Sequence, residues 1–217
     1  MEDSRPVETN SVTALILAGG FGTRSLDPTL PKVLQSLDPY TKIMDVQLRG
    51  LQNSGVSSVN FLLGHNADQV ISHIERCRAI YPSLKIGYFV EEVQQGTRVS
   101  VSDALALIPN SNEFLLILGD TVVFAPLAGY VSRWLDSSLE FAVLCHPNLH
   151  MEDSDLLGLD ESGKIRSYVE KGSGRVVDRG LLQVAATGAM FFTRRAFEST
   201  STSETDVTKA LVKSSLG

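Results

Sequence analysis

Short apolar runs alternate with stretches of helical periodicity along most of this chain. Runs rich in β-branched residues are typical of buried strands, and apolar residues at helical spacing are typical of helices. The pattern predicts strands at Val12–Leu17, Val59–Leu63, Lys85–Val90, Phe114–Leu118, Phe141–Cys145 and Gln183–Phe192. It predicts helices around Ala67–Ile74 and Ala125–Trp134, and one that ends at Leu105–Ile108. This alternation indicates an α/β fold, a Rossmann-like, mostly parallel sheet with helices on both faces.

Two local signals add detail to this fold. Asn66 followed by Gln69 predicts a helix start closed by a capping box. Farther along, Leu156–Leu159 and Ile165–Val169 flank a turn at Glu161–Gly163 and predict a β-hairpin over the sheet. We expect this hairpin to form a small β lid.

The most informative segment follows the first predicted strand and reads Leu17-Ala18-Gly19-Gly20-Phe21-Gly22-Thr23-Arg24. Its glycines let the backbone turn tightly and expose amides that bind anionic oxygens. Arg24 offers a planar fork of donors for phosphate, and Lys32 offers a compact charge. The loop lacks the ending of a P-loop and the third glycine of a dinucleotide fingerprint. It therefore predicts a nucleoside triphosphate site, with a plain tight turn as the alternative.

Asp120 ends the apolar strand before it, in Leu118-Gly119-Asp120. Its carboxylate is expected in the crevice at the carboxyl edge of the sheet, where ligands of open α/β sheets bind. That position suits Mg²⁺, which binds through few carboxylates together with substrate phosphates. A structural aspartate that caps a helix or turn is the alternative.

Composition and charge narrow the classes of partner. The 217 residues, 43% hydrophobic and 20% charged, predict one globular domain at 12–217 after a flexible tail at 1–11. The net charge of −6 argues against a nucleic-acid partner. We expect a cytoplasmic protein without a membrane partner, because the apolar runs are short and the acidic start is unlike a signal peptide. Cys77 and Cys145 show neither disulfide nor metal-ligand spacing and are expected to be reduced. The oligomeric state stays open, a homo-oligomer included.

The glycine loop and a series of ordered motifs resemble the sugar-1-phosphate nucleotidyltransferases, which join a nucleotide to a sugar phosphate and release pyrophosphate. The likeness runs from about Val12 to about Phe197. The motifs are Gly-Gly-Phe-Gly-Thr-Arg at 19–24, Pro31-Lys32, Gly55-Val56, Leu63-Gly64-His65, Ala67-Asp68-Gln69, Gly96-Thr97, Leu118-Gly119-Asp120, Gly158, Glu170-Lys171 and Thr187-Gly188. Segment 63–69 is most similar to the heptose- and mannose-1-phosphate guanylyltransferases and favours GTP, whereas Thr187-Gly188 is closer to the thymidylyltransferase form.

The resemblance implies in-line attack by a sugar-1-phosphate oxygen on the α-phosphorus of a nucleoside triphosphate. Arg24 would hold the triphosphate, Lys32 would stabilise charge at the α-phosphate, and Asp120 would be the ligand of a Mg²⁺ cofactor. The other nucleotide-binding residues implied are Leu17, Ala18, Gly19, Gly20, Gly22, Thr23, Gln95 and Gly96, the last two at the base. Those implied for the sugar phosphate are Gly158, Glu170, Lys171, Thr187 and Gly188, with Lys171 at the phosphate and Glu170 at sugar hydroxyls.

Two features depart from the family's pattern. Arg98-Val99 replaces small residues, and Arg98 is expected either to contact a phosphate or base or to point into solvent. The family's second metal-binding aspartate has no match near the C-terminal end of the domain, and Asp206 resembles a structural motif instead. We therefore expect either a truncated chain or metal binding through Asp120 and substrate phosphates alone. Two rival functions therefore stay open: a non-catalytic module that binds nucleotide sugars, and a nucleotidyltransferase that acts on a non-sugar alcohol phosphate.

Overall fold

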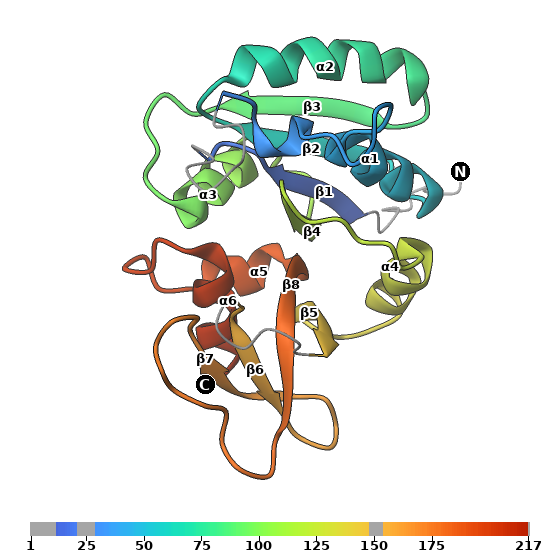
Figure 1. Ribbon diagram of the computed structural model, residues 1–217. Coiled ribbons are helices and arrows are strands. Elements are labelled where there is room, and N and C mark those ends of the chain that lie inside the picture. The colour runs from blue at the N-terminus through green and yellow to red at the C-terminus, as the bar shows by residue number, and fades with distance from the viewer. Residues whose placement is uncertain (1–11, 21–28, 148–153, 217) are drawn as a thin grey trace, which may run out of the picture.

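The computed structural model describes residues 12–20, 29–147 and 154–216, which form one mixed sheet flanked by helices (Figure 1). The predicted tail at 1–11 lies outside these residues. The strands are β1 (Val12–Leu17), β2 (Ser58–Leu63), β3 (Lys85–Val90), β4 (Glu113–Leu118), β5 (Phe141–Pro147), β6 (Leu156–Leu159), β7 (Ile165–Val169) and β8 (Leu182–Thr193). The helices are the short 3-10 helix η1 (Lys32–Leu34), α1 (Ile43–Asn53), α2 (Ala67–Ile80), α3 (Thr97–Leu107), α4 (Leu127–Leu135), α5 (Arg194–Glu198) and α6 (Val207–Ser215).

The sheet has the order β3-β2-β1-β4-β8-β6-β7, and β5 pairs separately with β8. Strands β3, β2, β1 and β4 are parallel, and the pairs from β8 outward are antiparallel. The parallel strands are joined through helices, as a parallel connection requires. Their carboxyl ends meet at one edge of the sheet, where the glycine loop after β1 and Asp120 after β4 both lie.

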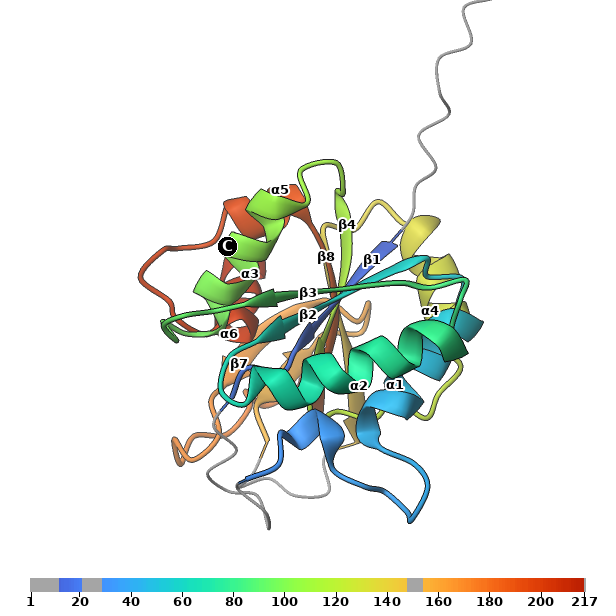
Figure 2. The ribbon, with the colours of Figure 1, turned by 90° about the horizontal axis from the view of Figure 1, so that it is seen from above.

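Helices cover both faces of the sheet, as the sequence predicts (Figure 2). On one face, α1, α2 and α4 pack against side chains such as Ile16, Phe61 and Ile117. On the other face, α3, α5 and α6 pack against side chains such as Leu15 and Phe114. The strands are therefore apolar on both sides, which explains why they read as continuous apolar runs instead of alternating patterns.

The predicted hairpin forms, but it does not lie over the sheet. Strand β6 pairs antiparallel with β7 and with residues 182–185 of β8, so the hairpin extends the sheet itself. The long strand β8 pairs with three strands. Residues 189–193 pair with β4, residues 184–192 pair with β5, and residues 182–185 pair with β6. The hairpin thus continues the sheet along β8 beyond the end of β4, on the side of Asp120.

Two predicted helix starts differ from the structure. Asn66 adopts the left-handed conformation and makes no capping bond; the side-chain amides of Asn66 and Gln69 instead donate to the Thr29 carbonyl. Helix α4 begins at Leu127 and not at Ala125, because a residue before a proline is disfavoured in helical geometry and Pro126 is better placed at the start. In the described part of the chain, no helix is long and apolar enough to cross a membrane.

Candidate active site

A cavity of about 340 Å³ opens at the carboxyl ends of β1 and β4, and we call it the β1–β4 cavity. One wall is the backbone that follows β1, and the opposite wall is the start of α3 and the segment after β3. Its polar and glycine lining comprises Gly19, Gly20, Lys32, Glu91, Gln94, Gly96, Thr97, Ser100, Gly119 and Asp120, with Leu17 and Ala18 among the apolar residues. The structure therefore brings together most of the residues that the sequence predicts for nucleotide binding.

Close backbone contacts explain Gly119, which lines this cavity, and Gly64, which lies against Gly19. A Cβ atom on Gly119 would lie 2.6 Å from the Leu17 carbonyl oxygen, and one on Gly64 would lie 2.8 Å from the Gly19 carbonyl oxygen. The Gly119 amide donates to the Leu17 carbonyl at 2.8 Å. The loops after β1, β2 and β4 thus touch through their backbones, and a side chain at Gly64 or Gly119 would force them apart.

Lys32 and Asp120 form an ion pair at the mouth of the cavity. The Lys32 Nζ atom lies 2.6 Å from Asp120 Oδ2, and the side chains are 32% and 45% exposed. They come from η1 and from the turn after β4, which are 88 residues apart in the chain. A cation that can hold phosphate oxygens and a carboxylate that can hold a metal ion therefore lie in direct contact.

The amino end of α3 is anchored from behind by the segment before α6. Gly96 has a φ of +105°, and a Cβ there would lie 2.6 Å from the Thr205 carbonyl oxygen. The Arg98 amide donates to the same carbonyl at 3.0 Å. The Thr97 hydroxyl accepts from the Val207 amide at 3.0 Å. These contacts fix Gly96 and Thr97 at the cavity wall.

Neither predicted position of Arg98 is found. The guanidinium is buried, lies 5.2 Å from the centre of the Phe197 ring and donates through Nε to the Thr200 hydroxyl at 3.0 Å. It therefore joins α3 to the chain after α5 and does not line the β1–β4 cavity. Asp206 caps α6 by accepting from the Lys209 amide, the structural role expected from its motif.

Two neighbouring glutamines face different cavities. Gln94 lines the β1–β4 cavity, and its amide donates to the Gly19 carbonyl. Gln95, the predicted base-binding residue, lines an adjoining hollow together with Glu92 and Asp103. This hollow shares Leu62, Glu91 and Ser100 with the β1–β4 cavity. The structure therefore brings Gln94 to the site and leaves Gln95 outside it. The sequence offers two adjacent glutamines and gives no reason to prefer either. The backbone geometry before Gly96 decides which side chain enters the β1–β4 cavity.

A larger cavity of about 750 Å³ adjoins Asp120 on its other side, between α4 and β5, and we call it the α4–β5 cavity. Thr187 lines it, and the Thr121 hydroxyl donates to the Thr187 carbonyl at 3.1 Å. Gly188 has a φ of +81°, and a Cβ there would lie 2.7 Å from the Thr121 hydroxyl. Thr187 and Gly188 are thus held against the turn that carries Asp120.

A profile of the family described as "Nucleotidyl transferase" matches residues 13–214. The chain belongs to the nucleotidyl transferase family. Glucose-1-phosphate adenylyltransferase of Hydrogenovibrio crunogenus is 24% identical over 180 residues, which are 75% of this chain and 42% of that protein. The chain therefore spans less than half the length of this curated relative.

Solved structures show the same fold. UDP-glucose pyrophosphorylase complexed with UDP-glucose matches with a TM-score of 0.76 at 19% identity, over 95% of this chain and 87% of that one. HddC from Yersinia pseudotuberculosis complexed with GMP-PN matches with a TM-score of 0.69 at 22% identity, over 90% and 82% of the two chains. These relatives differ in the nucleotide they are named for, so membership of the nucleotidyl transferase family leaves the nucleotide open.

Other residues predicted for substrate are not gathered around the β1–β4 cavity of this nucleotidyl transferase. A Cβ on Gly158 would lie 2.3 Å from the Ser167 hydroxyl and 2.7 Å from a Val177 methyl group, so side chains already cover this glycine. Glu170 pairs with Lys209 of α6 at 2.8 Å, and this hydrogen bond lowers the pKa of Glu170. The Lys171 amide donates to Asp155. Gly22, Thr23 and Arg24 lie outside the described residues.

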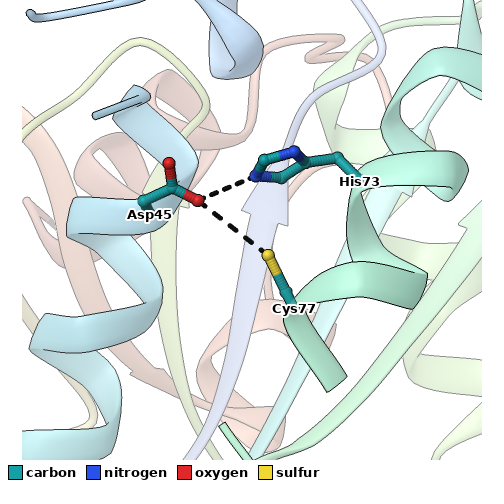
Figure 3. A group of neighbouring side chains, drawn as sticks. All are labelled: Asp45, His73 and Cys77. Carbon is teal, nitrogen blue, oxygen red and sulfur yellow. Dashed lines mark hydrogen bonds and ion pairs between the residues drawn. The ribbon is translucent and has the colours of Figure 1, made fainter. Parts of the chain in front are cut away.

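A second polar cluster joins α1 to α2 and was not foreseen from the sequence (Figure 3). His73 Nε2 lies 2.7 Å from Asp45 Oδ1, and the Cys77 thiol faces the same oxygen at 3.9 Å. The spacing of four between His73 and Cys77 places both on one face of α2, which is the signal that could have revealed it. The ligand atoms of the three residues lie within 4.8 Å of one another, as in a metal site.

Hydrogen bonds join Asp45, His73 and Arg76 in this cluster, and we call the three residues the Asp45–His73 clamp. Arg76 can only donate, so its bond to His73 Nδ1 at 3.0 Å leaves the proton of the neutral ring on Nε2, facing Asp45. Burial raises the pKa of the Cys77 thiol to about 11, so the sulfur carries a proton in this cluster. Burial likewise raises the pKa of Cys145 to about 11, and both thiols are free.

Replacing Asp45 with alanine is expected to destabilise the fold by about 2–3 kcal/mol. The change leaves the buried His73 Nε2 proton unpaired and removes the acceptor of the bond that the Lys42 amide donates to Asp45 at the start of α1. Urea unfolding followed by circular dichroism measures the loss. Asp68→Ala, which removes an exposed acid from the first turn of α2, is the control and should change the unfolding free energy by less than about 0.5 kcal/mol. Equal losses of unfolding free energy in the two variants would show that the Asp45–His73 clamp does not stabilise the fold.

Proposed function

We propose that this chain transfers a nucleoside monophosphate from a nucleoside triphosphate to a sugar-1-phosphate and releases pyrophosphate. The observation that carries the proposal is the contact between Lys32 and Asp120 at the mouth of a glycine-walled cavity at the carboxyl edge of the sheet. The family membership and the naming of its relatives as sugar-1-phosphate enzymes support the same reaction.

The reaction needs positioning and charge stabilisation and no general base, because the attacking phosphate oxygen is already ionised. That oxygen forms a bond to the α-phosphorus while the bond to the bridging oxygen breaks, and the electron pair leaves with pyrophosphate. Lys32 stabilises the charge that builds at the α-phosphate. Arg24 and the amides of Gly22 and Thr23 are proposed to hold the triphosphate beside Gly19 and Gly20.

The residues fit Mg²⁺. Asp120 offers a half-exposed carboxylate that borders both the β1–β4 cavity and the α4–β5 cavity, and Mg²⁺ is bound in such sites by one carboxylate or two together with phosphate oxygens. Asp120 would hold the ion, which when bound neutralises phosphate charge. Lys32 would then exchange its bond to Asp120 for bonds to phosphate.

We propose that the acceptor binds on the β8 side of Asp120. The α4–β5 cavity offers room for a sugar phosphate, and Thr187 presents a polar side chain there. Glu170 and Lys171 remain proposed contacts of the sugar phosphate at the end of β7, where Glu170 would exchange its bond to Lys209 for sugar hydroxyls. Donor and acceptor would thus meet at Asp120, and in-line transfer requires the acceptor oxygen to approach the α-phosphorus on the side opposite the leaving pyrophosphate.

We propose guanine as the preferred base, on the strength of Glu91 and Gln94 in the cavity lining. Guanine presents two adjacent donor groups, at N1 and N2, and one carboxylate can accept hydrogen bonds from both. The Watson–Crick edge of adenine offers one donor and one acceptor, so a carboxylate cannot pair with it in this way. The structure of HddC with GMP-PN shows a fold of this kind with a guanine nucleotide, which supports the proposal.

Replacing Glu91 with glutamine should lower kcat/KM for GTP by about 10- to 100-fold, because a charge-assisted pair with the base is lost. The value for ATP should change by less than about threefold. Initial rates of pyrophosphate release with each nucleotide measure both. Glu92→Gln is the matched control, since Glu92 lines the hollow that contains Gln95 but does not line the β1–β4 cavity, whereas Glu91 lines both. Equal losses for GTP and ATP, or none for GTP, would reject the role of Glu91.

A further inference from the structure

Gln47 of α1 reaches from the helix to the turn that carries Asp120. Its side chain is buried, with 4% of the residue exposed. The Nε2 atom donates to the Leu118 carbonyl at 3.2 Å and to the Thr121 carbonyl at 2.8 Å. An amide nitrogen has two protons, so both are used, and they hold the two ends of one turn.

This turn is held at several points around Asp120. The Thr121 amide closes it by donating to the Leu118 carbonyl at 2.9 Å, and the Gly119 amide donates to Leu17. The Thr121 hydroxyl donates to the Thr187 carbonyl. Gln47 adds the contact that links the turn to α1, so Asp120 lies at the tip of a turn fixed to β1, β8 and α1.

The other end of this link leads to Lys32. Helix α1 follows η1 closely, and the chain between them is held by a bridge between Ser36 and Lys42 and by a bond from Lys42 Nζ to the Leu34 carbonyl at 3.0 Å. Lys32 is therefore fixed to the amino end of α1, while Gln47 fixes Asp120 to the same helix. One helix sets the separation of the two charged groups.

The oxygen of the Gln47 side-chain amide makes no hydrogen bond to the described residues, which shows that the nitrogen is the functional part of this group. Its Oε1 atom is buried and has no hydrogen-bond partner among the described residues. An unpaired buried acceptor costs stability, so an apolar side chain of similar size would suit this place if packing were its only task. The two donated bonds therefore account for the amide at this position.

We propose that Gln47 is a positioning residue that holds Asp120 in place to bind the metal ion of the reaction. The inference rests on the proposed function, in which Asp120 is a metal ligand. Gln47 touches neither substrate nor metal in this account; it acts through the Leu118–Thr121 turn. Its loss should weaken metal binding more than it weakens the fold, because the other bonds of the turn remain.

The test measures Mn²⁺ binding by electron paramagnetic resonance with a non-hydrolysable GTP analogue present. Gln47→Met should weaken Mn²⁺ binding by about tenfold, the usual effect of removing a group that orients a metal ligand. Gln52→Met is the matched control: Gln52 lies on the same helix and also has a buried, unpaired Oε1 atom. This control should change Mn²⁺ affinity by less than about twofold. Thermal unfolding of both variants separates metal binding from stability.

Each outcome decides the inference. Unchanged Mn²⁺ affinity in folded Gln47→Met, or an equal loss in Gln52→Met, overturns it. If Gln47→Met does not fold, Gln47→Asn replaces it, since its shorter amide cannot reach both carbonyls, and the same tenfold loss is expected while unchanged affinity overturns it. Wild-type protein that binds no Mn²⁺ with the analogue would overturn the proposed function itself, which is a different failure.

Discussion

Replacing Lys32 with alanine is expected to lower kcat by about 10²–10³-fold while the protein stays folded. In the proposed reaction the ammonium stabilises charge that develops at the α-phosphate, so its loss would raise the barrier of the chemical step. Both partners of the ion pair with Asp120 are substantially exposed, so removing it should cost little stability. Steady-state rates of pyrophosphate release and thermal unfolding measure the two effects.

Lys213→Ala is the matched control for this experiment. Lys213 also pairs with a carboxylate, Glu204, but on α6 and outside the lining of the β1–β4 cavity. Its replacement should leave kcat within about twofold of the wild-type value. A folded Lys32→Ala variant with full turnover would show that Lys32 has no part in the chemistry.

Replacing Asp120 with asparagine is expected to reduce turnover by about a hundredfold or more, because the metal ion supplies several kcal/mol of charge stabilisation. Asparagine has the same shape but lacks the charge that holds Mg²⁺ in the proposed reaction. Raising the Mg²⁺ concentration should recover part of the activity, which would show weakened metal binding and not a blocked site. Turnover as a function of Mg²⁺ concentration measures this.

Asp68→Asn serves as the control for Asp120, because Asp68 is an exposed acid in the first turn of α2. Its Mg²⁺ dependence should match that of the wild type. If Asp120→Asn keeps both the turnover and the Mg²⁺ dependence of the wild type, Asp120 is a structural residue of its turn and the metal assignment is wrong.

The sequence predicts the fold well because the relevant signals are local. Buried parallel strands such as Val12–Leu17 read as apolar runs whatever their partners, and the alternation with helices then fixes the class. The placement of the hairpin fails because pairing of β6 with β8 depends on residues more than twenty positions apart. A turn signal shows that two strands pair with each other and says nothing about the sheet edge that they join.

The sequence predicts which types of residue form the candidate site, but it does not predict which side chains point into the cavity. Lys32 and Asp120 meet because η1 and β4 end at the same edge of the sheet, which the motifs imply. The choice between Gln94 and Gln95 depends on the conformation at Gly96, which packs on Thr205 far along the chain. The burial of Arg98 also depends on long-range packing, since its aromatic partner Phe197 lies far along the chain. Long-range packing of this kind leaves no pattern near the residue concerned.

The most direct test of the proposed reaction is pyrophosphate release by the purified chain with Mg²⁺. Each of GTP, dTTP, UTP, CTP and ATP is paired with a panel of sugar-1-phosphates and, in parallel, of non-sugar alcohol phosphates. We predict release that requires metal, a sugar-1-phosphate and a nucleotide, fastest with GTP. A folded chain that binds nucleotide but releases no pyrophosphate with any acceptor would contradict the account and identify a binding module; release only with non-sugar acceptors would reject the sugar.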